Sequence, residues 1–144
     1  MAHILRILLA VVLGFVAGSV VNMTLISVGG TVVPPPAGAN VATMEGLRAA
    51  MHLFEPKHFL FPFLAHAFGT LVGAAVAGLL APARSALPSL VVGGLFLLGG
   101  IASVFMLPSP LWFTALDLAL AYLPFAWLGL ATSKRLQGLR RGGA

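Results

Sequence analysis

Residues 86–107 read ALPSLVVGGLFLLGGIASVFML and contain no charged side chain. A helix rises 1.5 Å per residue, so about 20 apolar residues cross the ~30 Å hydrocarbon core of a bilayer. Backbone N–H and C=O groups in lipid must bond within their own segment, which requires a helix. The segment therefore predicts a transmembrane helix.

Three further apolar segments of similar length lie at about 4–28, 58–81 and 110–132. The 144 residues are 60% hydrophobic and 8% charged, whereas roughly a quarter of a soluble domain is charged. So few charges cannot cover a water-facing surface, and lipid is the expected solvent. We predict one integral membrane domain over 1–144, an all-α bundle of four transmembrane helices.

A secretory signal peptide is the alternative for the first segment. Arg6 gives it a short basic start, and Ala17-Gly18-Ser19 resembles a cleavage site. The apolar run continues to about Val28, however, which is longer than an ordinary signal-peptide core. We therefore expect an uncleaved first span.

The fourth segment contains an interior proline and several large aromatic residues. Pro124 lies in its interior, where proline should kink the helix and free a carbonyl near Leu120. Trp112 and Tyr122 are interpreted as interface or wall aromatics. The segment is thus expected to be a bent helix.

Basic residues are distributed unevenly between the loops. One side would carry Arg6, Arg84 and a basic tail over 133–144, whereas the loop on the other side carries two basic residues balanced by two acidic ones. Short cytoplasmic loops are enriched in Lys and Arg, so both termini are expected in the cytoplasm. The tail would then bind anionic lipid. No coherent basic surface is interleaved with aromatics, so no nucleic-acid partner is expected.

The one long loop, residues 29–57, is expected on the extracytoplasmic side. Pro34-Pro35-Pro36 near its start is typical of a stiff polyproline-like element. Thr43 then stands as an N-cap before apolar residues at helical spacing, which are Met44, Leu47, Met51 and Phe54. We predict a short amphipathic helix that lies on the membrane surface or caps the bundle.

Glycines recur at helical spacing in the first two segments. Gly14 and Gly18 share one face, and Gly69 and Gly73 share another. Small residues let helices approach closely in lipid, so both pairs are interpreted as packing faces. The pattern does not distinguish packing within one chain from a homo-oligomer or from a partner in a membrane complex.

Polar residues inside a span are costly in lipid and therefore informative. Counted from the expected outer ends of their segments, Asn22, His66 and Asp117 lie roughly 9, 12 and 11 Å deep at 1.5 Å per residue. Thr114 shares the face of Asp117. We predict one intramembrane polar layer, and two interpretations stay open. It either fixes helix register through hydrogen bonds or lines a water-reachable cavity whose protonatable pair serves proton-coupled transport.

His52, Glu55 and His58 form an H-x-x-E-x-x-H run before the second segment. Two imidazoles and a carboxylate could hold Zn²⁺ or copper, although Pro56 interrupts helical spacing. The run is therefore either a metal site at the outer mouth or a set of interfacial polar residues. No other cofactor is predicted, and the absence of cysteine excludes disulfides and thiolate ligands.

Common soluble-enzyme signatures such as G-x-S-x-G, H-E-x-x-H and Walker A do not occur in the sequence. We expect a small transporter or permeation element that uses the polar layer. One alternative is a non-catalytic accessory or assembly subunit of a membrane complex. A second is a membrane enzyme acting on lipid or quinone, which is less favoured because one intramembrane acid and one histidine are available for acid–base work.

Four stretches carry a resemblance: MHLFEPKHF at 51–59, AHAFGTLVGA at 65–74, Trp112-Phe113 and Asp117-Leu118. In these stretches the chain resembles small uncharacterised four-span bacterial membrane proteins, and the similarity covers most of its length. The resemblance implies a multi-pass protein of the bacterial inner membrane with no known activity. It transfers no functional residue to this chain.

Overall fold

The computed structural model describes residues 1–82 and 85–142, with side chains up to Leu139. Within these ranges, helices are the only regular secondary structure. Four helical segments are long and apolar enough to cross a membrane, namely Ala2–Val32, Pro56–Leu80, Leu87–Met106 and Leu111–Leu139. The prediction of a multi-pass, all-helical protein with four candidate membrane spans is confirmed.

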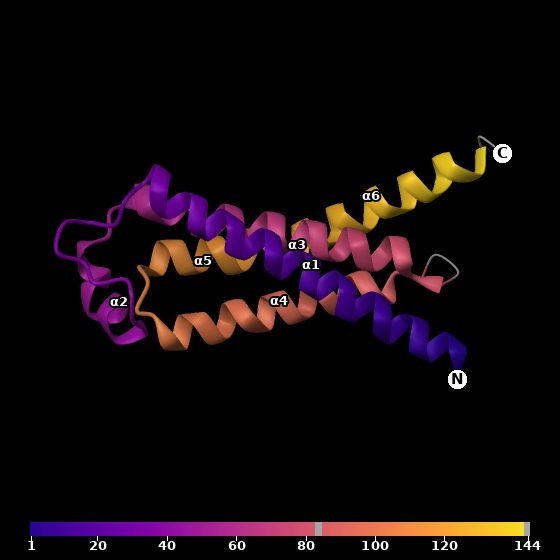
Figure 1. Ribbon diagram of the computed structural model, residues 1–144, viewed down its shortest axis with the longest axis horizontal. Coiled ribbons are helices and arrows are strands. Elements are labelled where there is room, and N and C mark those ends of the chain that lie inside the picture. Colours follow the sequence, from indigo (N-terminus) through magenta and orange to yellow (C-terminus); the bar gives the residue numbers. More distant parts are fainter. Residues whose placement is uncertain (83–84, 143–144) are drawn as a thin grey trace.

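The long helices run side by side, with both chain termini at one end of the bundle and α2 at the other (Figure 1). We call these the terminal end and the loop end. The elements in chain order are α1 (Ala2–Val32), α2 (Met44–Ala50), η1 (Met51–Leu53), η2 (Pro56–Phe59), α3 (Leu60–Leu80), α4 (Leu87–Met106), α5 (Leu111–Leu120) and α6 (Leu123–Gly142).

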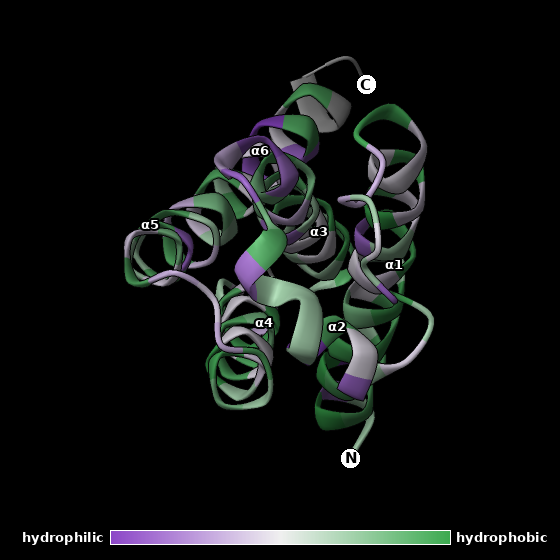
Figure 2. Cartoon of the chain, turned by 90° about the vertical axis from the view of Figure 1, so that its left-hand side faces the viewer, coloured by the Kyte–Doolittle hydropathy of each residue, from purple (hydrophilic) through white to green (hydrophobic). Residues whose placement is uncertain are grey.

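Helix α3 lies at the centre of the bundle and contacts α1, α4 and α6 (Figure 2). It can do so because small residues face its neighbours. The alanines at 65, 67, 74 and 77 are fully buried on α3. Close approach of helix backbones gains dispersion contacts, which drive helix association in lipid.

The two glycine pairs meet each other across α1 and α3. A Cβ atom on Gly14 would lie 2.6 Å from the carbonyl oxygen of Gly73, and one on Gly18 would meet the carbonyl oxygen of Gly69. Any side chain at Gly14 or Gly18 would therefore push the two helices apart. These glycines pack within one chain.

Large apolar side chains are exposed on the outside of the bundle, and hydrophobic residues predominate along the long helices (Figure 2). Phe105 is 80% exposed, Leu111 83% and Leu98 63%. In water such a surface would be strongly unfavourable, whereas lipid chains are as apolar as these side chains. The arrangement fits a hydrocarbon solvent around the four long helices.

The fourth span is interrupted between α5 and α6, at Ala121 and Tyr122. Pro124 follows directly and has no N–H to donate to the carbonyl of Leu120, which frees that carbonyl and ends α5. The predicted break is present at this place. It turns the chain so that Tyr122 lies close to α5.

The long loop contains a short helix where one was expected. Thr43 Oγ1 accepts a hydrogen bond from the Gly46 N–H at 3.0 Å and caps α2. The helix ends at Ala50 and passes into a 3₁₀ turn, so it stops before Phe54. Its amphipathic contact with a membrane surface remains a prediction.

The basic tail is helical and continues α6 to Gly142. The side chain of Gln137 donates to the carbonyl of Gly78 at 3.0 Å, which ties the tail to the end of α3. Lys134 and Arg135 are exposed. Three more basic residues were predicted on the cytoplasmic side. Arg84 lies outside the described residues, and Arg140 and Arg141 lie outside the described side chains.

Candidate functional site

Two ionisable side chains from different helices meet inside the bundle. Nδ1 of His66, on α3, lies 2.9 Å from Oδ1 and 2.9 Å from Oδ2 of Asp117, on α5. Asp117 is 5% exposed, whereas the His66 side chain is 22% exposed. An ionised carboxylate only accepts hydrogen bonds, so Nδ1 carries the proton of this contact.

Tyr122 contacts both members of this pair. Its hydroxyl donates to Oδ2 of Asp117 at 2.9 Å, and its ring stacks on that of His66 with centroids 5.6 Å apart. The residue is 1% exposed, so its interpretation as an interface or wall aromatic is wrong. The signal that could have found it is Pro124, because the break in the helix lets a residue five positions after Asp117 turn back onto it.

The predicted polar layer is only partly brought together. Thr114 lies one helical turn before Asp117 and lines the same cavity as His66 and Asp117. Asn22 instead packs on Gly69, where an added Cβ would lie 3.1 Å from the Cβ of Asn22. Within 1–82 and 85–139, the Asn22 side chain makes no hydrogen bond to His66 or Asp117. Asn22 therefore belongs to the α1–α3 contact.

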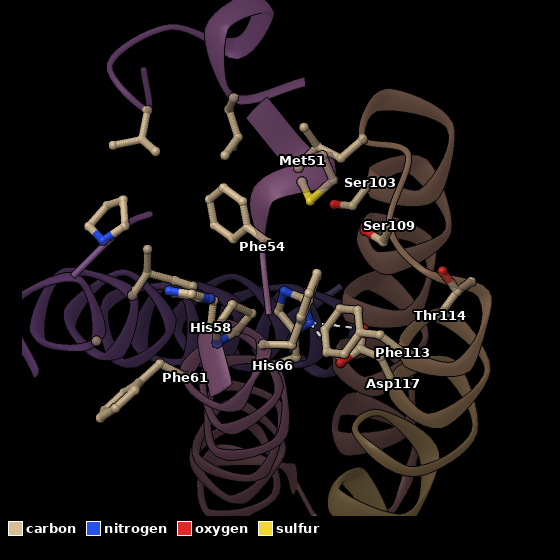
Figure 3. A pocket seen from close by; sticks show the side chains of 18 of the residues that line it. Met51, Phe54, His58, Phe61, His66, Ser103, Ser109, Phe113, Thr114 and Asp117 are labelled. Carbon is tan, nitrogen blue, oxygen red and sulfur yellow. Dashed lines mark hydrogen bonds and ion pairs between the residues drawn. The ribbon is translucent and has the colours of Figure 1, made fainter. Parts of the chain in front are cut away.

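A cavity of about 400 Å³ lies at the loop end of the bundle and reaches down to His66 and Asp117 (Figure 3). Most of its lining is apolar. Ile26 of α1 contributes on one side, and Met51 and Phe54 of the long loop cover it from the loop end.

One wall of the cavity is polar. Ser103 of α4, Ser109 of the α4–α5 turn and Thr114 of α5 line it on the same side, opposite Phe54 and His58 (Figure 3). The Ser103 hydroxyl donates to the carbonyl of its own helix at Gly99, 3.0 Å away. The cavity thus offers hydroxyl groups along one wall and apolar side chains on the others.

The second ring nitrogen of His66 is available to the cavity. Nε2 has no hydrogen-bond partner in the described part of the chain. In that part every fully buried side-chain nitrogen and oxygen has a partner. Nε2 is therefore not fully buried. In the neutral imidazole with a proton on Nδ1, Nε2 is an acceptor. Asp117 therefore fixes which nitrogen His66 presents to a bound molecule.

Below the pair, toward the terminal end, the helices pack tightly. Thr70, Ala74 and Val92 are fully buried there. The Ser89 hydroxyl donates to the carbonyl of Ala74 at 2.8 Å and joins α4 to α3. The cavity consequently ends at His66 and Asp117, and the bundle is closed beneath them.

The H-x-x-E-x-x-H run is engaged in local contacts. His52 Nδ1 donates to the carbonyl of Ala49 at 2.8 Å, and His58 Nδ1 accepts from the Glu55 N–H at 2.9 Å. The Glu55 carboxylate pairs with Lys57 at 3.0 Å. Among the residues that the structure describes, no three His, Cys, Asp or Glu side chains form a group that could hold a metal ion. A zinc or copper site is therefore not assembled from this run.

The site thus combines an imidazole held by a carboxylate, a tyrosine hydroxyl and a mainly apolar cavity. The free nitrogen of such an imidazole can bond to a molecule in the cavity. Comparisons of the chain with protein-family models, with curated proteins and with solved structures gave no match.

Proposed function

We propose that this chain is a small transporter that admits a mainly apolar molecule into the loop-end cavity and exchanges a proton with it through His66 and Asp117. The observation that carries the proposal is the orientation of His66. Its Nδ1 is held by Asp117 while Nε2 faces the cavity.

The composition of the cavity supports a mainly apolar molecule. No Lys or Arg side chain of the described residues lines it, and apolar side chains dominate its surface. Its volume of about 400 Å³ lies in the range of ~300–1,000 Å³ that is typical of small-molecule sites. Hydrated ions would be poorly accommodated, because a charge without a partner is costly in apolar surroundings.

The pair itself supports proton exchange. With His66 protonated and Asp117 ionised, the two side chains form an ion pair that is neutral as a unit. Loss of one proton from Nε2 changes the charge presented to the cavity while Asp117 stays bonded to Nδ1. Binding of a molecule at Nε2 would thereby be coupled to the protonation state of the pair.

The interruption of the fourth span supports a movement that changes the end of the bundle from which the site can be reached. Transporters commonly place their sites at interrupted helices, where neighbouring parts of a bundle move against each other. Here the break at Ala121 and Tyr122 lies directly beside Asp117, and the bundle is closed on the other side of the pair. A rotation of α5 against α6 would open the site toward the terminal end.

The proposed location is the bacterial inner membrane, with both termini in the cytoplasm. Two exposed basic residues of the tail, Lys134 and Arg135, lie at the terminal end, where they would meet anionic lipid headgroups. At the loop end, Lys57 is paired with Glu55. The cavity would accordingly face the extracytoplasmic side.

The test uses purified protein in liposomes that enclose a pH-sensitive dye. Neutral, mainly apolar molecules with one hydrogen-bonding group are added outside, and the internal pH and the internal concentration of each molecule are followed. We expect at least one molecule to be taken up together with a pH change, and Asp117→Asn and His66→Gln to abolish both. His52→Gln is the matched control, because His52 lies on the loop and does not line the cavity. Unaltered uptake in both pair variants, with the protein folded, would sink the proposal.

A non-catalytic accessory subunit is the second candidate. Gly94 and Gly99 of α4 meet nothing within 4 Å of an added Cβ, so they leave room for a helix of another chain. Copurification of a fixed membrane partner that is lost in Gly94→Leu would favour this role. A membrane enzyme acting on lipid or quinone would instead return a chemically altered molecule in the liposome assay, because the carboxylate-held imidazole could serve as a general base.

A further inference from the structure

Nε2 of His66 is a hydrogen-bond acceptor without a protein partner at the base of the cavity. Both oxygens of Asp117 accept from Nδ1 of His66, and Oδ2 also accepts from Tyr122. The hydroxyl hydrogen of Tyr122 is used in that contact. A molecule that reaches this depth therefore meets the lone pair of Nε2 and needs an O–H or N–H group to bond with it.

The charges around the cavity favour a neutral molecule. An anion would find no Lys or Arg side chain among the described residues that line the cavity, and Lys57 outside it is already paired with Glu55 at 3.0 Å. A cation would find one carboxylate in the lining, that of Asp117, and both of its oxygens already accept from His66 or Tyr122. Leaving an ion unpaired in apolar surroundings costs several kcal/mol. A neutral donor avoids this cost.

The walls of the cavity favour an aromatic ring. Phe54, Phe59, Phe61 and Phe113 line the cavity, and the rings of Phe59 and Phe113 pack with centroids 4.7 Å apart at an interplanar angle of 42°. Aromatic rings gain energy from such tilted contacts beyond the burial of their surface. A further ring would extend this cluster.

We infer that the cavity binds a neutral phenol, in which a hydroxyl group on an aromatic ring donates to Nε2 of His66 while the ring packs against the phenylalanines. Phenolic hydroxyls ionise near pH 10, so the molecule is uncharged at neutral pH. A second polar substituent would lie along the wall of Ser103 and Thr114. The inference rests on the proposed function, because it names the class of molecule that the same cavity admits.

The experiment compares two probes that differ only at the phenolic oxygen. 4-Propylphenol carries the hydroxyl, and 4-propylanisole has the same ring and chain but a methylated oxygen. Binding to the full-length protein in lipid nanodiscs is measured after subtraction of partitioning into protein-free nanodiscs. The ¹⁵N resonances of the four histidines are recorded in parallel, with that of His66 assigned from His66→Gln. We expect the phenol to bind at least ten times more tightly and to shift Nε2 of His66, and the anisole to leave that resonance unchanged.

Two serine variants keep the inference testable if His66→Gln fails to fold. Ser103→Phe places a ring inside the cavity, and Ser27→Phe is its matched control. Both hydroxyls donate to a carbonyl four residues earlier in their own helix, but Ser27 is exposed and does not line the cavity. We expect Ser103→Phe to weaken phenol binding at least tenfold and Ser27→Phe to leave it unchanged.

Equal affinities for phenol and anisole, with no shift at His66, would overturn the phenol inference, as would equal binding by the two serine variants. The transport proposal fails separately. If the phenol binds as expected but the liposome assay gives the same uptake and pH change for the wild type and Asp117→Asn, the ligand class stands and the proton-coupled role does not.

Discussion

Nδ1 of His66 lies 2.9 Å from both carboxylate oxygens of Asp117, although 51 residues separate the two in sequence. The contact links the central helix α3 to α5, the short helix before the break in the fourth span. A second donor to the same carboxylate is the hydroxyl of Tyr122, which lies in the break between α5 and α6. One buried carboxylate thus joins α3, α5 and the break that follows α5.

This hydrogen-bond network predicts that two substitutions lower the unfolding free energy by different amounts. Asp117→Ala removes the acceptor shared by His66 and Tyr122 and leaves two donors unpaired, so we expect a loss of about 3 kcal/mol of unfolding free energy. Tyr122→Phe removes one donor and keeps the His66 contact, and we expect a loss of about 0.6–1.7 kcal/mol. Equilibrium unfolding in mixed detergent micelles measures both. A larger loss for Tyr122→Phe than for Asp117→Ala would contradict the network described above.

A second prediction concerns the contact between α1 and α3. In Gly18→Val the new side chain would collide with the carbonyl oxygen of Gly69 and with the ring of Phe96, both of which belong to packed helices. We expect this variant to lose about 3 kcal/mol or more, because overpacking costs ~1–3 kcal/mol and separation of the helices adds to it. Gly99→Val is the control, since a Cβ there meets nothing within 4 Å. Equal unfolding free energies for the two variants would show that the glycine contact is not required.

The sequence predicted the helical architecture because its determinants are local. An apolar run of the right length needs no partner to be identified, as in residues 86–107, and the break caused by Pro124 follows from a missing N–H. The depth of a residue along a helix also follows from counting. This is why His66 and Asp117 could be placed at one level from their distances to the ends of their segments.

The rest of the site depends on how each helix is rotated about its own axis and on which helices pack together. Neither property can be read from a single segment. Asn22 has the right depth but faces the glycine contact with α3, so it does not join the pair. Tyr122 would point elsewhere in a continuous helix and reaches Asp117 only across the break. The cavity itself forms between residues of four helices and the long loop, and no local pattern predicts such a space.

A third prediction tests the orientation in the membrane. The chain has no cysteine, so single cysteines can be labelled without interference. Ala37→Cys lies in the exposed part of the long loop, and Leu139→Cys lies on the tail, where Leu139 is 73% exposed. In intact cells a membrane-impermeant thiol reagent should label position 37 at once and position 139 only after permeabilisation, as the distribution of basic residues predicts. The reverse order of labelling would invert the proposed topology and place the cavity mouth in the cytoplasm.

The last prediction concerns the surface of the bundle. Side chains such as Phe105, Leu98 and Leu111 are largely exposed on the long helices, with no polar face to replace them. Apolar area costs roughly 25 cal/mol per Å² in contact with water, so exposed surfaces of this kind associate with one another in water. Removal of detergent should therefore aggregate the protein, whereas transfer into lipid nanodiscs should preserve a single species in size-exclusion chromatography. A folded, monodisperse chain in detergent-free and lipid-free buffer would mean that these surfaces are covered by contacts within or between chains, and neither the membrane spans nor the site derived from them would hold.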